Sequence, residues 1–188
     1  MAAPTVQDVR DYICPELISM LRAVVRFEEI RDQRSTATDG GAIDLSALED
    51  SALMHARKLV EFAAASPDNT ATSQWALCDI LGTHPRKVPS RLTAFLDDAV
   101  TRLTDQHAAE QRWPKDVDGN RIVGDDPHRL SILAALVLKV LRPKHRTTTL
   151  ETDVGALYVE VLDRAHDYLE QRTAVALKNL TRCATSDS

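Results

Sequence analysis

The sequence contains few aromatic residues and is rich in small and aliphatic ones. Phenylalanine, tyrosine and tryptophan make up 4% of the 188 residues, whereas apolar residues as a class make up 44%. Alanine, leucine and valine must therefore supply the core, and these residue types suit helix packing better than a β-sandwich. A chain of this length can form one domain with a sizeable core. We expect a single helical domain over residues 1–188, with frayed tails at residues 1–4 and 183–188.

The chain also has few cysteines and no long apolar run. Cys14, Cys78 and Cys183 are far apart, and none stands in a CxxC or Cys/His metal spacing. This usage is typical of a reduced cytosolic chain with inert thiols. The N-terminus MAAPTVQDVR shows no signal-peptide pattern, and the longest apolar run, ILAALVL at residues 132–138, is too short to span a bilayer. We therefore expect a cytoplasmic protein with no membrane partner.

Apolar residues recur at helical spacing along most of the chain, and no alternating strand pattern is convincing. Thr5 and Asp8 predict the start of a first helix, which Pro15 should kink or divide. Ser46 and Glu49 form a capping-box pattern that predicts the start of a second helix, continuing to about residue 65.

Four further helical segments follow. A short one, QWALCDIL, stops at Gly82, and the next opens at Pro89 with an inner stripe of Leu92, Leu96, Ala99 and Leu103. The segment LSILAALVLKVL is apolar on nearly all sides and must stop near Pro143, so we expect it at the centre of the fold. The last helix should start near Thr149 and could continue to Arg182. Five or six helices with short links predict an all-α, antiparallel helical bundle.

An arginine and a histidine stand five positions apart in RLTDQH, at Arg102 and His107. Histidine can move a proton near neutral pH, and arginine can hold a phosphate through a fork of donors. The pair could therefore cleave RNA without a metal. On one ideal helix, five residues turn about 500°, which leaves the two side chains roughly 140° apart. Catalysis thus needs a helix end, a distortion or a second protomer. The other interpretation is a surface Arg102 paired with Asp98 and a partly buried structural His107.

The spacing of Arg102 and His107 resembles R-x4–6-H, the signature of the HEPN superfamily of helical bundles. LMHARKLVEF at residues 53–62 and AVTRLTDQHAAEQR at residues 99–112, preceded by VPSRLTAFL, are also similar to bacterial HEPN-like proteins. The resemblance covers about the middle half of the chain. It implies a homodimeric, metal-independent ribonuclease of toxin or defence type, in which Arg102 binds phosphate and His107 is the catalytic histidine.

The position after the arginine departs from this family pattern. Active HEPN ribonucleases usually carry a polar residue there, often Asn, Asp or His, whereas this chain has Leu103. A second function therefore stays open: a non-catalytic helical module that dimerises and binds a protein or nucleic-acid partner.

Two basic segments could add contacts to RNA phosphates if the fold joins them. Their basic residues are Arg86, Lys87, Arg91, Arg142, Lys144 and Arg146. The simpler interpretation is that they are solvated charges near helix ends, where they favour the helix dipole. The net charge of −5 argues against a general nucleic-acid binder but permits a local basic patch.

No other motif predicts a cofactor or metal. DVDGNRIVGDD alternates acidic residues, but the EF-hand positions that require glycine and a bidentate acid hold Arg121 and Pro127. The doublet in AHD, at residues 165–167, lacks the further ligands of a metal phosphohydrolase, and no phosphate-binding glycine loop occurs. His55 is expected to be a hydrogen-bonded core histidine, and Arg57 to be solvated or to pair with Glu61.

Overall fold

The computed structural model describes residues 3–34, 42–65, 77–82, 87–102 and 128–173. These residues form helices and no strand, which confirms the all-α prediction for this part of the chain. The elements are α1 (Val6–Asp8), the π-helix η1 (Val9–Ile13), α2 (Cys14–Arg34), α3 (Ala42–Ala64), α4 (Leu77–Leu81), α5 (Ser90–Arg102), α6 (Arg129–Leu141), α7 (Arg146–Thr149) and α8 (Asp153–Arg172).

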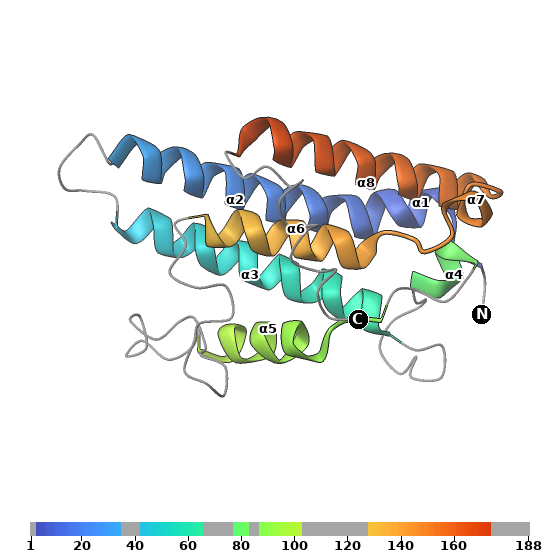
Figure 1. Ribbon diagram of the computed structural model, residues 1–188, viewed down its shortest axis with the longest axis horizontal. Coiled ribbons are helices and arrows are strands. Elements are labelled where there is room, and N and C mark those ends of the chain that lie inside the picture. Colours follow the sequence, from blue (N-terminus) through green and yellow to red (C-terminus); the bar gives the residue numbers. More distant parts are fainter. Residues whose placement is uncertain (1–2, 35–41, 66–76, 83–86, 103–127, 174–188) are drawn as a thin grey trace, which may run out of the picture.

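Four long helices, α2, α3, α6 and α8, lie along the longest axis of the molecule, and α5 packs on the outer side of α3 (Figure 1). Glu16, near the start of α2, bonds His55 in the second half of α3, whereas Phe27 and Glu49 both contact Arg129. The helices α2 and α3 therefore run in opposite directions. Figure 1 shows α8 running with α2, and α6 running with α3.

The first helical segment begins and divides as predicted. The Thr5 hydroxyl accepts from the Asp8 N–H at 3.2 Å, and the Asp8 carboxylate accepts from the Thr5 N–H at 2.7 Å. The division falls just before Pro15, where the Cys14 N–H donates to the Val9 carbonyl in a wider π-turn. Because Pro15 has no N–H to offer the preceding turn, the regular ladder is interrupted at this point.

The predicted start of the second helix at Ser46 is wrong. The helix α3 begins at Ala42, so Ser46 lies inside it. Glu49, the other half of the expected capping box, is buried, and its carboxylate accepts from the Arg129 Nε at 2.9 Å. The Glu49 carboxylate, which the capping-box pattern assigned to a helix cap, thus binds Arg129, 80 positions away in the chain.

The predicted ends of two later helices are confirmed. Gly82 follows α4 with a φ of 63°, and its N–H donates to the Cys78 carbonyl at 3.0 Å. The helix α6 ends at Leu141, two residues before Pro143. The last predicted helix, expected to start near Thr149, starts instead at Asp153, after Thr152, whose hydroxyl accepts from the Gly155 N–H at 3.0 Å. It ends at Arg172, before the Arg182 to which it could have continued.

The helix α6 lies at the centre of the core, as its sequence predicts. Its buried apolar residues are Leu130, Leu133, Ala134, Ala135, Val137, Leu138, Val140 and Leu141. Leu136 and Ile132 are half-buried, and Lys139 is the exposed position. Within the described part of the chain, no helix is both long and apolar enough to cross a membrane.

Candidate functional site

A buried carboxylate marks one end of the bundle. Glu28 is 3% exposed and continues the core-facing stripe of Leu17, Leu21 and Val24 along α2. An ionised carboxylate in such a position must be paired and hydrogen-bonded, because burying an isolated charge is very costly. Glu28 is thus a carboxylate that needs hydrogen-bonding partners, at a position where the helical pattern predicts an apolar residue.

Three side chains meet that requirement. The Ser131 hydroxyl donates to Glu28 Oε1 at 2.6 Å, while His128 Nδ1 and Arg31 Nη2 lie 2.9 and 2.5 Å from Glu28 Oε2. Because a carboxylate only accepts, the proton of His128 must sit on Nδ1. Arg31 Nη2 and His128 Nδ1 then lie only 3.3 Å apart because both donate to the same acceptor, Glu28 Oε2, and not because they bond each other. Glu28 therefore ties α2 to the start of α6.

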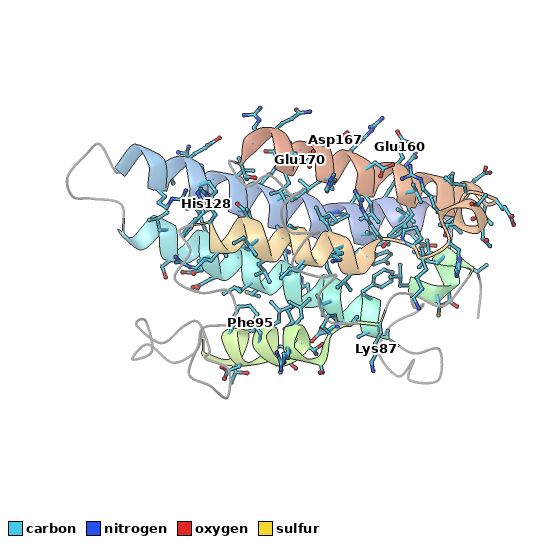
Figure 2. All side chains as sticks on the ribbon, in the orientation of Figure 1. Lys87, Phe95, His128, Glu160, Asp167 and Glu170 are labelled. Atoms are coloured by element: carbon cyan, nitrogen blue, oxygen red, sulfur yellow. The ribbon has the colours of Figure 1, made fainter. Side chains whose placement is uncertain are left out.

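A second ion pair extends this contact to α3. The Arg129 Nε donates to Glu49 Oε1 at 2.9 Å, and the Arg129 guanidinium lies 5.3 Å from the centre of the Phe27 ring. We call the hydrogen-bonded and ion-paired residues of this region the Glu28 junction. They are Glu28, Arg31, Glu49, His128, Arg129 and Ser131. Figure 2 places His128 at the end of the molecule where α3 and α6 begin.

The residue types of the Glu28 junction suggest a hydrolase, but its geometry does not. Nucleophilic catalysis needs a serine whose proton passes to a neighbouring base. Here the Ser131 hydroxyl donates to Glu28 and not to His128, and Ser131 is fully buried. The junction is therefore a structural contact among three helices.

Arg102, the candidate phosphate-binding residue, is the last residue of α5, and His107 lies outside the described residues. The helix α5 is fixed to the body by buried Leu92, Phe95, Leu96 and Ala99, of which Phe95 was not predicted. The labelled Lys87 and Phe95 show that the C-terminal end of α5 points toward the end of the molecule that carries His128 (Figure 2).

The candidate RNA-binding residues fall into two groups. Lys87 and Arg91 are exposed at the start of α5, whereas Arg86 lies outside the described residues. Arg142 and Lys144 belong to the connection from α6 to α7, and Arg146 is the first residue of α7. Arg146 Nη2 and Nη1 lie 2.6 and 3.3 Å from the two carboxylate oxygens of Asp163, so its charge already has a bidentate partner.

On α5, positions 91 and 102 are separated by about 16 Å along the axis and share one side of the helix, because eleven residues make about three turns.

The two secondary candidates on α3 are hydrogen-bonded as expected. His55 Nδ1 lies 2.6 Å from Glu16 Oε2 at a half-buried position, and Lys58 Nζ donates to Glu16 Oε1 at 3.0 Å. Burial acts to raise the pKa of Glu16, but the hydrogen bonds from His55 and Lys58 outweigh it and leave that pKa below its ordinary value. Arg57 pairs with Glu61 at 2.8 Å and also with Asp97 of α5 at 3.1 Å.

The described residues offer no evident metal site and no activated cysteine. Among them, no group of three or more histidine, cysteine or acidic side chains could hold a metal ion. Cys14 and Cys78 are free thiols, and burial raises the pKa of both above the ordinary value. A higher pKa lowers the thiolate fraction and hence the reactivity of each thiol. Cys183 lies outside the described residues.

Comparisons with known proteins assign no family, because no protein-family model, no curated protein and no solved structure matches the chain. The function must therefore be argued from the residues themselves.

Proposed function

We propose that the protein is a HEPN-like, antiparallel helical bundle that cleaves RNA without a metal, with Arg102 and His107 as its catalytic residues. It acts as a single-domain homodimer in the bacterial cytoplasm, in a toxin or defence system. The observation that carries the proposal is the placement of Arg102 at the end of α5, a helix whose inner face is buried against α3. Because the inner face of α5 is buried, the backbone position from which Arg102 extends is fixed.

The chemistry follows from the two side chains. His107 takes the proton of a ribose 2′-hydroxyl, whose oxygen attacks phosphorus. A 2′,3′-cyclic phosphate forms as the bond from phosphorus to the 5′-oxygen of the next nucleotide breaks, and that oxygen takes a proton from water. Arg102 offsets the negative charge on the phosphorus centre. Lys87 and Arg91, exposed at the other end of α5, extend the positive charge along the same helix and bind neighbouring phosphates.

An RNA cleavage assay on the purified protein tests this proposal. Cleavage should survive EDTA, and His107→Ala should reduce the rate by about 10²–10⁴-fold because it removes the proton-transfer group. Arg102→Ala should lower it by about 10²-fold or more. His166→Ala is the matched control, since His166 lies on α8 beside Glu170 and should leave cleavage unchanged. Unaltered cleavage by His107→Ala would rule out this catalytic assignment.

The second candidate function is a non-catalytic helical module that dimerises and binds a protein or nucleic-acid partner. Leu103 favours it, because active family members usually carry a polar residue at that position. Two exposed apolar side chains also favour it, since Tyr12 is 57% exposed and Met54 49% exposed. A dimer that binds RNA in a gel-shift assay without cutting it would support this function over the first.

A further inference from the structure

A groove lies between α2 and α8. It has a volume of about 480 Å³, and its apolar lining includes Leu17, Ile18 and Leu21 of α2 and Val161, Ala165 and Tyr168 of α8. Figure 1 shows these two helices lying alongside each other over most of the length of α8. The groove shares no residue with the Glu28 junction or with the proposed ribonuclease residues.

Apolar side chains remain partly exposed on both walls. Ile18 on α2 is 46% exposed, and Tyr168 on α8 is 37% exposed. Each could bury more apolar surface against an occupant of the groove, and that burial would favour binding. The walls therefore suit an apolar ligand.

The charged groups at the groove have one sign. Arg22 and Arg164 line it, and no acidic side chain does so among the described lining residues. Arg22 forms no hydrogen bond or ion pair with any residue that the structure describes. Arg164 lies 2.5 Å from Glu160 one turn away, but both side chains are exposed, and such pairs are weak. An anionic group of the ligand would thus meet, at Arg22, a guanidinium that pairs with none of the described residues.

The size of the groove favours a small molecule over a protein. Its lining on α2 extends from Cys14 to Arg22, which corresponds to about 12 Å of helix. Stable protein interfaces use about 20–30 residues from each partner, whereas ligand sites have volumes of about 300–1,000 Å³. The groove falls in the second class.

We propose that this groove binds a medium-chain fatty acid, with its alkyl chain between Leu21 and Ala165 and its carboxylate on the Arg22 guanidinium. The Cys14 thiol, also in the lining, is held neutral and so adds no negative charge that would repel the ligand. Each methylene group that leaves water strengthens binding, and the carboxylate–arginine pair fixes the orientation.

Titration calorimetry with dodecanoate, kept below its micelle concentration, tests the proposal on the full chain. We expect one bound dodecanoate per protomer, weaker binding of octanoate, and weaker binding of the uncharged dodecanol. Arg22→Gln should weaken dodecanoate binding by about tenfold or more, because it removes a charge-assisted hydrogen bond. Arg26→Gln is the matched control, since Arg26 lies one turn further along α2, pairs with Glu29 and does not line the groove. Equal weakening by both variants, or tighter binding of dodecanol than of dodecanoate, would overturn the proposal.

A second measurement locates the ligand. Bound dodecanoate should slow alkylation of Cys14 by N-ethylmaleimide, read by peptide mass spectrometry, while Cys78 on α4 reacts at an unchanged rate. Ala165→Leu, which fills the groove from α8, should abolish both the binding heat and the protection of Cys14. Binding that leaves Cys14 unprotected would place the fatty acid elsewhere and refute the assignment.

Discussion

The two ends of the bundle are closed by different chemistry. At one end, the Glu28 junction joins α2, α3 and α6 through charged side chains. At the other end, where α4, α6, α7 and α8 meet (Figure 1), the buried polar contacts are between neutral groups, and the Arg146–Asp163 ion pair lies at the surface. There the buried Tyr158 hydroxyl donates to the Leu141 carbonyl at 2.8 Å, and the Thr149 hydroxyl donates to the Leu81 carbonyl at 3.3 Å. We call this second contact the Tyr158 junction.

The two junctions depend on different physical requirements. The Tyr158 junction depends on shape, because a Cβ placed on Gly155 would lie 1.9 Å from the Thr149 carbonyl oxygen. Burial also raises the pKa of the Tyr158 phenol far above its ordinary value, so the hydroxyl remains a donor over the pH range of a folded protein. The Glu28 junction depends on charge balance, because Arg31 and His128 share the buried Glu28 carboxylate as a partner. Substitutions that change charge should therefore destabilise the fold mainly at the Glu28 junction, and substitutions that change side-chain volume mainly at the Tyr158 junction.

The largest expected effect is at the Glu28 junction. Glu28→Ala removes the acceptor shared by Arg31, His128 and Ser131, and it should lower the free energy of unfolding by about 3 kcal/mol. This figure is at the low end for a buried ion pair because the Arg31 and His128 side chains are 22% and 30% exposed. Urea denaturation would measure the loss. Glu29→Ala is the control, since Glu29 pairs only at the surface with Arg26 and should cost under about 0.5 kcal/mol.

At the Tyr158 junction, Gly155→Ala tests the dependence on shape. The added methyl group meets backbone, which cannot rotate away as a side chain could, so we expect a loss of about 2–3 kcal/mol in thermal or urea unfolding. Gly82→Ala provides the comparison. Its Cβ would meet open space, so only the positive φ of 63° opposes it, at about 1 kcal/mol. Equal losses at the two glycines would show that α7 moves aside and that the fit at Gly155 is loose.

The sequence predicts the local features of both ends better than the contacts between them. The Thr5–Asp8 cap, the Gly82 cap and the central position of α6 depend on residues near one another in the chain, and the structure confirms them. Apart from the local Glu28–Arg31 pair, the Glu28 junction joins side chains 80 to 103 positions apart. The available signal was a glutamate in the stripe of Leu17, Leu21 and Val24, which predicts a buried charge but not its partner.

The same reasoning applies to the candidate site. The spacing of Arg102 and His107 gives residue types suited to RNA cleavage, and α5 places Arg102 at a helix end, but spacing alone fixes no distance between side chains. The basic segments could be found by composition. Whether the fold joins them could not, because this depends on how α5 packs along α3 and on the ion pair that Arg146 forms with Asp163.

A smaller effect should come from the hydroxyl of the Tyr158 junction. Tyr158→Phe keeps the ring that fills the core and leaves the Leu141 carbonyl without this donor, so we expect a loss of about 1–2 kcal/mol by urea denaturation. Tyr168→Phe is the matched control, because Tyr168 is 37% exposed and its hydroxyl should contribute almost nothing. A loss equal to that of the control would mean that water replaces the phenol at Leu141.

The smallest loss of stability is expected at the half-buried contact of Glu16 with His55 and Lys58, which differs from the two buried junctions in its exposure to water. Glu16 bonds His55 and Lys58 with its side chain 26% exposed, and its pKa in the folded protein is lowered from the model-compound value of 4.5. A lowered carboxyl pKa stabilises the folded state above the unfolded pKa, and this contribution is lost as the pH falls through the folded pKa. Glu16→Gln should therefore cost under about 1 kcal/mol at pH 7, and the difference from wild type should shrink as the pH falls below 4.5. Urea denaturation of the two proteins at a series of pH values measures it. A difference that grows on acidification would mean that protonation favours the Glu16 contact, opposite to the direction of its pKa shift.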